Sequence, residues 1–185
     1  MAKQFDALND DHTGFIAAQH LFFVGTAAPE GRVNISPKGM DSLRVLGPNR
    51  IVWLNLTGSG NETAAHLARA NRMTLMWIGF ERRPLILRAY GQARILHPGT
   101  PGWDALPEAL TNIKGARQAF DMDVEMVMTS CGYGVPFYDY KGERDVLEKW
   151  AEAKGDDGLT RHWHTQNSAS IDGFPTDFAP LSDDT

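Results

Sequence analysis

The sequence predicts a mainly β protein with added helices, in which about six antiparallel strands form a barrel. Apolar runs are separated by turns that contain Pro and Gly at hairpin spacing, most clearly in "LFFVGTAAPEGRVNISP", residues 21–37. Helical patterns are few, and they do not alternate regularly with strands as in a doubly wound parallel sheet. The length of 185 residues suits one domain with a core of its own.

The N-terminal half begins with a predicted helix over residues 10–20, because apolar side chains recur there at helical spacing. Two strands joined by the turn "APEG" follow within residues 21–37, which predicts a hairpin. The stretch "IVWLNLT", residues 51–57, comes after the turn "GPNR" and carries apolar side chains on both alternating sides. We therefore expect a strand that is covered on both faces.

The middle of the chain predicts a helix from about residue 61 to 70, followed by strands over residues 72–80 and 85–97. Gly91 lies inside the second of these strands. A glycine in that position typically marks a bulge or a bend, so we expect one there.

The C-terminal part predicts two short helices within residues 101–120, a closing strand over 123–130 and a clear helix over 142–155 that ends at Gly155. The tail from residue 171 is rich in Pro, Asp and small residues, and we expect it to be extended over the surface or disordered. The organisation expected is a barrel with inserted helices over residues 1–140, with a C-terminal helix and extended tail over 141–185 packed on the same domain.

Composition and charge exclude two classes of partner. The chain has 18 Lys and Arg against 23 Asp and Glu, a formal net charge of −5 at pH 7, and no basic block, which argues against binding to nucleic acid. Its apolar runs are far shorter than the roughly 20 residues that span a bilayer. The stretch "MAKQFDALNDDH" has no apolar signal region, and one cysteine agrees with a reducing compartment. We expect a soluble, cytoplasmic protein that binds neither nucleic acid nor membrane.

Three histidines and one cysteine, residue types that can bind metals or undergo redox reactions, are not assigned to a functional site. His162 and His164 would point the same way only on a strand, and no third ligand is near in the sequence, so we expect no metal site. The lone Cys131 is interpreted as a small buried filler. His66 is placed on the surface of its predicted helix.

The stretch "NLTGSGNETAAHL", residues 55–67, places two glycines and several small polar residues in front of an amphipathic helix. It lacks the Gly-Lys-Ser/Thr of a phosphate loop and the third glycine of the dinucleotide fingerprint. Two interpretations stay open. Ser59 and Glu62 could form a capping box, or the first amides of the helix, with Asn61 and Thr63, could bind an anion.

A second stretch, "RVNISPKGMD" at residues 32–41, places Lys38 just past a predicted strand, where a lysine can reach a pocket as a point charge. The ordered series "ISPKG", "LTGSGNETAAHL", "NRMTLMWIGF" and "LRAYGQARI" resembles the pyridoxamine 5′-phosphate oxidase superfamily of flavin-binding split barrels, from about residue 15 to 135.

This resemblance implies a six-stranded antiparallel split β-barrel that forms a homodimer and binds one flavin mononucleotide (FMN) in each of two clefts at the subunit interface. It places Lys38 near the flavin ring, with Ser36 and Pro37 leading into it. It also implies that the strand, loop and helix start hold the phosphate and the edge of the ring, through Leu56, Thr57, Gly60, Asn61, Glu62 and Thr63. Tyr133 and Gly134, beyond the last barrel strand, could lie over the partner's flavin or form a tight connection at the dimer edge.

The chain also departs from the vitamin B6 oxidases of this superfamily. Those enzymes hold the phosphate with basic side chains at the start of the helix, where this chain has Asn61, Glu62 and Thr63. We therefore expect backbone amides and hydroxyls to bind the phosphate, with Arg72 and Arg88 as the basic candidates. The chain is interpreted as a relative of the B6 oxidase and not as that enzyme itself.

The function expected from the resemblance is an FMN-dependent oxidoreductase that transfers a hydride through flavin N5 to or from an unknown small-molecule substrate. Lys38 would stabilise negative charge on the reduced ring. No residue pair in the sequence requires a catalytic acid or base, so none is assigned. The alternatives are a flavin carrier or sensor without steady turnover, and a relative that handles deazaflavin or haem.

Overall fold

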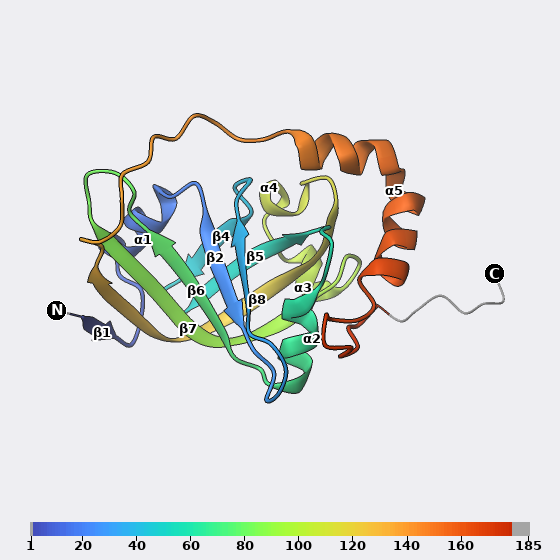
Figure 1. Ribbon diagram of the computed structural model, residues 1–185, viewed down its shortest axis with the longest axis horizontal. Coiled ribbons are helices and arrows are strands. Elements are labelled where there is room, and N and C mark those ends of the chain that lie inside the picture. Colours follow the sequence, from blue (N-terminus) through green and yellow to red (C-terminus); the bar gives the residue numbers. More distant parts are fainter. Residues whose placement is uncertain (1, 179–185) are drawn as a thin grey trace.

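The computed structural model describes residues 2–178. It is built on one antiparallel sheet of eight strands in the order β3-β2-β6-β7-β8-β5-β4, with β1 paired to β8 (Figure 1). The strands are β1 (Lys3–Phe5), β2 (Phe22–Thr26), β3 (Asn34–Lys38), β4 (Leu43–Gly47), β5 (Arg50–Leu56), β6 (Met73–Ile78), β7 (Leu85–Leu96) and β8 (Ala116–Cys131).

The predicted class, mainly β with added helices, is confirmed, although residues 2–178 contain eight strands where about six were expected. The pattern of the sequence did not single out the short β1 and β4. The helices are α1 (Asp10–Ala17), α2 (Glu62–Arg69), α3 (Pro101–Asp104), α4 (Glu108–Thr111) and α5 (Val146–Gln166).

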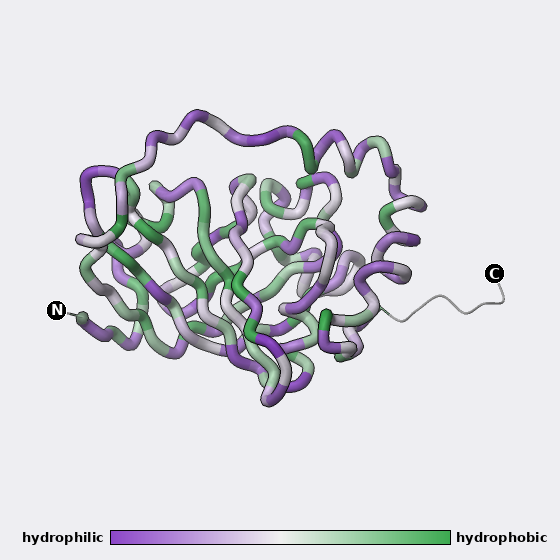
Figure 2. Tube along the Cα trace, in the orientation of Figure 1, coloured by the Kyte–Doolittle hydropathy of each residue, from purple (hydrophilic) through white to green (hydrophobic). Residues whose placement is uncertain are grey.

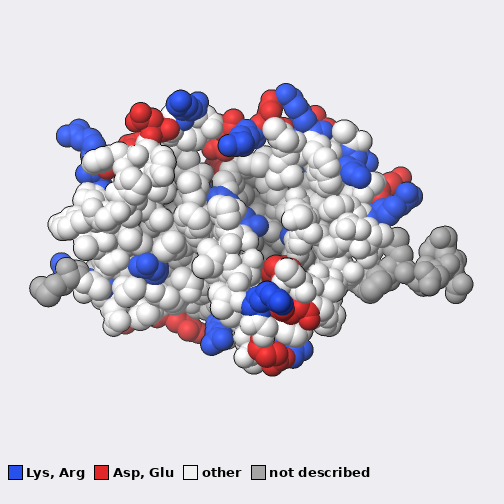
Figure 3. Space-filling view, in the orientation of Figure 1, with Lys and Arg blue, Asp and Glu red and all other residues white. Residues whose placement is uncertain are grey.

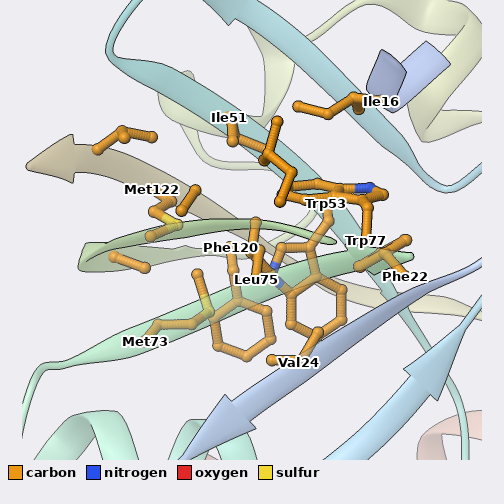
Figure 4. Packing of buried hydrophobic residues seen from close by; sticks show 14 of the residues in the cluster. Ile16, Phe22, Val24, Ile51, Trp53, Met73, Leu75, Trp77, Phe120 and Met122 are labelled. Atoms are coloured by element: carbon orange, nitrogen blue, oxygen red, sulfur yellow. The ribbon is translucent and has the colours of Figure 1, made fainter. Parts of the chain in front are cut away.

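The sheet curves around a core to which β2, β5, β6, β7 and β8 all contribute. Trp53 and Phe120, on paired positions of β5 and β8, stack with ring centroids 4.6 Å apart, and Trp77 lies beside them (Figure 4). All three side chains are fully buried. Each large apolar side chain moved out of water contributes about 1.5–3 kcal/mol, so this cluster is a main source of the barrel's stability.

Residues 116–120 correct a prediction, because they form the start of β8 and not part of a helix. Asn55 on β5 pairs with Gln118, and Trp53 pairs with Phe120, while Leu96 on β7 pairs with Ala119. The segment is therefore paired with β5, and its residues 119 and 120 are also paired with β7. Hydrogen bonding within the sheet outweighs the local preference of the segment for helix.

The bulge expected at Gly91 is confirmed, since the register of β7 on β8 shifts between Tyr90 and Gly91. A Cβ atom placed on Gly91 would lie 2.0 Å from the carbonyl oxygen of Asp123. Only glycine allows the two backbones to approach this closely.

Helix α5 continues beyond its predicted end. Gly155 does interrupt the helix, with a non-helical conformation of φ 64° and ψ 173°, but a second helical segment follows it directly and runs to Gln166. The strands carry most of the hydrophobic residues, whereas the segment from β8 to α5 and α5 itself are largely hydrophilic (Figure 2). The segment crosses the top of the barrel in this view and brings α5 to the loop that precedes α2 (Figure 1).

Candidate functional site

A cavity of about 730 Å³ lies between β3, the loop after β5, the start of α2, the start of β8 and the C-terminal segment. Seven of the predicted binding residues line it: Ser36, Pro37, Lys38, Gly60, Asn61, Glu62 and Thr63. Figure 3 shows a hollow in this face of the molecule with Lys or Arg atoms inside it. The lining also includes residues that the sequence did not single out: Arg32, Asn55, Arg117, Gln166, Ala169, Ser170 and Ile171.

The helix start faces this cavity without a capping side chain. Helix α2 begins at Glu62, and its N-cap Asn61 makes no side-chain hydrogen bond to the helix. The capping box interpretation, with Ser59 as the cap, is therefore wrong. Both Glu62 carboxylate oxygens instead accept from the backbone amide of Ile171, at 3.0 and 3.2 Å. The first-turn amides thus keep the donor capacity that favours an anion.

Asn61 itself is buried, and its side chain belongs to a network of amides beneath the cavity. It is hydrogen-bonded to Asn55 at 3.1 Å and to Gln118 at 2.9 Å. The Asn61 side chain therefore holds the loop in place through these hydrogen bonds. The hydrogen-bond donors that the helix start offers to the cavity are backbone amides.

Arg117 is the buried cation of the site, with 2% of its surface exposed. Its Nη2 atom donates to the carbonyl oxygen of Gly60 at 2.8 Å, and Nη1 donates to Oδ1 of Asn167. When the side-chain amide of Asn55 is oriented with its oxygen toward Arg117, this oxygen accepts from Nε and Nη2 of Arg117, each at 3.1 Å. Burial lowers the pKa of the guanidinium to about 10, so it stays charged at neutral pH.

The sequence missed Arg117 because residues 101–120 were interpreted as helical. The two basic candidates named from the sequence lie elsewhere. Arg88 donates to Oγ of Ser130 at 3.3 Å, and Arg72 lines a different cavity, between β2, β6 and β7. A single basic residue within the run "GARQAF" was the only available signal.

Lys38 ends β3 and reaches the cavity from the opposite wall. Its Nζ atom lies 5.5 Å from the centroid of the Trp53 ring. Burial, and then the positive charge of Arg117, lower the pKa of Lys38 to about 8. An anion placed between the two cations would offset this repulsion, so the electrostatics of the cavity favour a negatively charged ligand.

Thr57 and Leu56 lie beside the cavity rather than in its lining. Thr57 is buried, and its hydroxyl donates to the carbonyl oxygen of Gly115 and accepts from Nε1 of Trp163, both at 2.8 Å. Leu56 packs on the small apolar cluster around Val52 and Leu110. Both residues therefore anchor the loop that carries the site.

Tyr133 and Gly134 lie beyond the opposite end of β8 from Arg117, on the segment that leads toward α5. Tyr133 is 81% exposed, and a Cβ atom placed on Gly134 would meet no other atom within 4 Å. The chain does not bring them to its own cavity. Their predicted place over a partner's flavin stays a prediction.

Two further expectations are wrong. His66 is buried, with Nδ1 3.0 Å from Oγ1 of Thr26, because α2 turns this side chain toward β2 and not toward solvent. Cys131 is exposed at the end of β8.

His162 lies on α5 with Nε2 3.2 Å from the carbonyl oxygen of Gly58, and residues 2–178 contain no group of three metal-ligating side chains. Nor does any helix among the described residues have the length and hydrophobicity needed to cross a bilayer.

Comparison with known proteins identifies related sequences. A model of the pyridoxamine 5′-phosphate oxidase family matches residues 8–131. The chain is also 32% identical over 189 residues to the pyridoxamine 5′-phosphate oxidase family protein ustO of Aspergillus flavus, a match that covers 92% of this chain and 76% of the relative.

Solved structures share the fold at lower identity. HupZ of Group A Streptococcus has a TM-score of 0.54 at 21% identity, and the match covers 64% of this chain and 91% of that one. A Clostridium acetobutylicum protein of the pyridoxinephosphate oxidase family, related to general stress protein 26, has a TM-score of 0.52 at 15% identity, with 74% and 94% of the two chains covered.

Proposed function

Because the chain belongs to the pyridoxamine 5′-phosphate oxidase family, we propose that it binds FMN in the cavity between β3 and α2 and acts as an FMN-dependent oxidoreductase. One observation carries this proposal. Arg117, Lys38 and the uncapped start of α2 converge on one cavity from three different elements.

The charge balance of the cavity supports an anionic ligand. Within residues 2–178, the hydrogen-bond acceptors found for Arg117 are the neutral oxygens of Gly60, Asn167 and Asn55. The carboxylate of Asp177 acts on this guanidinium as a nearby charge, but burial outweighs it and lowers the pKa of Arg117. A phosphate group nearby would further offset the cost of burying the cation. The net charge of the chain is −5, so this local excess of positive charge runs against the overall composition.

The residues present fit the two parts of FMN. The backbone amides at the start of α2 would hold the phosphate, and Arg117 would supply its main counter-charge. Lys38 and the β3 backbone would line the ring. Bound FMN would supply a two-electron carrier that exchanges a hydride at N5 with a small-molecule substrate. Lys38 would then hold a positive charge beside the ring and stabilise its reduced, anionic form.

We also propose that two chains form the functional unit. Val33, just before β3, and Ile35, on β3, are 71% and 68% exposed. They lie beside a separate cavity that Phe23, Met76 and Tyr90 also line. An exposed apolar surface of this kind beside the site is suited to a second copy of the chain. Tyr133 and Gly134 of that copy would complete the cleft.

The test is the absorbance spectrum of the purified protein, with release and identification of any bound chromophore. We expect a flavin spectrum and FMN after release, or binding of added FMN to the colourless protein. A protein that neither retains nor binds FMN would contradict the proposal, as would one that binds only haem or a deazaflavin. Bound FMN that no reductant or substrate can reduce would indicate a carrier or sensor in place of an enzyme.

A further inference from the structure

The C-terminal segment forms a compact turn at the edge of the cavity. In this C-terminal turn, residues 169–175, the amide of Ser170 donates to the carbonyl oxygen of Phe174 at 2.8 Å, and Gly173 donates to that of Ser170 at 3.0 Å. Gly173 adopts φ 78°, a conformation that favours glycine. Residues 171–175 therefore form a turn where an extended or disordered tail was expected, while residues 179–185 lie outside those described.

The tip of the C-terminal turn joins the two walls of the cavity. On one side, the Asp172 carboxylate accepts from the backbone amide of Arg32 at 2.7 Å and forms an ion pair with its guanidinium. On the other side, the amide of Ile171 donates to the carboxylate of Glu62, the first residue of α2. Ala169, Ser170 and Ile171 themselves line the cavity.

A third attachment, at the base of the turn, fixes its position relative to the loop ahead of α2. The buried Asn167 accepts from Nη1 of Arg117, and its Nδ2 atom donates to the carbonyl oxygen of Gly58 at 3.1 Å. The guanidinium of Arg69, on α2, lies over the ring of Phe174 at 4.3 Å. The turn is thus held by four contacts, one with the β3 side of the cavity and three around the helix start.

Resting on FMN as the ligand, we propose that the C-terminal turn selects ligands that end in a single phosphate. Three of its residues line the cavity beside the start of α2, where the phosphate would be held. A flavin mononucleotide ends there. A flavin adenine dinucleotide continues from that phosphate into a second phosphate and a nucleoside, which would have to pass through the turn.

The experiment measures dissociation constants for riboflavin, FMN and flavin adenine dinucleotide by quenching of flavin fluorescence, with the full chain and two variants. Asp172→Ala removes the ion pair to Arg32. A chain ending after Ser168 removes the turn but keeps Asn167. The matched controls are Asp11→Ala, which removes an exposed ion pair to Arg83, and a chain ending after Phe178.

We expect the full chain and both controls to bind FMN more tightly than the dinucleotide. In Asp172→Ala this preference should fall about tenfold, and it should fall further without the turn. The ratio of FMN to riboflavin affinity should stay within about threefold, since the phosphate contacts remain.

An unchanged preference in Asp172→Ala, with FMN still bound, would overturn the role of the turn and leave the proposed function intact. Equal affinity of the full chain for FMN and the dinucleotide would do the same. Absence of FMN binding by the full chain would overturn both proposals. If the truncated chain fails to fold by circular dichroism, Asp172→Ala decides the matter.

Discussion

The Nη2 atom of Arg117 donates to the carbonyl oxygen of Gly60 at 2.8 Å, and this bond joins the start of β8 to the loop ahead of α2. The Gly60 carbonyl oxygen thus points toward the positively charged guanidinium of Arg117. The loop ahead of α2 and the cation that would balance a bound anion are therefore hydrogen-bonded to each other.

Replacing Arg117 should weaken phosphate binding selectively. We expect Arg117→Met to raise the dissociation constant for FMN about 10- to 100-fold and that for riboflavin less than about threefold, because a charge-assisted interaction is lost only with the phosphorylated ligand. Fluorescence titration with both flavins measures the two constants. Arg94→Met, on the exposed side of β7, is the control. Equal weakening of both flavins would show that Arg117 acts only through the fold.

Asn61 should matter for stability. Asn61→Ala leaves the buried side chain of Gln118 without a hydrogen-bond partner and removes one of the partners of Asn55, so we expect the free energy of unfolding to fall by about 1–3 kcal/mol. Urea denaturation followed by circular dichroism measures this change. Ser59→Ala is the control, because Ser59 does not cap α2. A stability equal to that of the full chain would contradict the network.

Binding of FMN should depend on pH through Lys38. Its pKa is lowered to about 8, so raising the pH from about 7 to 9.5 removes its proton and its attraction for an anion. FMN affinity should fall over this interval, while riboflavin affinity should change less. Lys38→Met should bind FMN more weakly at pH 7 and lose this pH dependence. The same profile in the variant would assign the titration to another group.

The free energy of unfolding should change with pH in the opposite direction to FMN affinity, and rise as Lys38 loses its proton. In the unfolded chain Lys38 holds its proton to a higher pH than in the folded chain, so the unfolded state binds more protons between about pH 8 and the ordinary lysine pKa. The destabilising contribution of Lys38 is present below about pH 8 and is relieved as the pH rises through this window. Denaturation of the ligand-free protein at several pH values, compared with Lys38→Met, isolates this contribution.

The stacked pair in the barrel should dominate stability. We expect Phe120→Ala to lower the free energy of unfolding by about 3–5 kcal/mol, because it removes a fully buried ring that packs on Trp53. Val146→Ala, at an exposed position on α5, should change it by less than about 0.5 kcal/mol. Thermal or urea unfolding compares the two variants, and similar losses in both would contradict this core.

A charge on the exposed face of β3 should prevent association of two chains. We expect the full chain to sediment as a dimer and Ile35→Glu as a monomer, because a carboxylate placed in an apolar interface is not compensated. Tyr133 would no longer reach the site of the partner. A full chain that sediments as a monomer at micromolar concentration would contradict the shared cleft.

The local pattern was sufficient for several parts of the site. Turn residues and alternating apolar side chains predicted the strands that carry Lys38 and Leu56, and the glycine-rich stretch before an amphipathic helix predicted the start of α2. These features depend on neighbours in the chain, and such neighbours impose the same backbone conformation wherever the segment lies.

Other parts were beyond any local pattern. The strand start at residues 116–120 was mistaken for a helix, since its conformation depends on pairing with β5 and β7. For a similar reason His66 was expected on the surface and is buried, whereas Cys131 was expected to be buried and is exposed. Which face of an element is covered depends on what packs against it.

The sequence by itself therefore determined the class of fold, the family and the loop that forms one wall of the cavity. Only the tertiary structure decided what completes that wall: Arg117 from the start of β8, and the C-terminal turn with Asp172. Arg117 bonds to a residue 57 positions away, and Asp172 to one 140 positions away. Contacts over such separations form only when the whole barrel has closed, so no local preference of the chain records them.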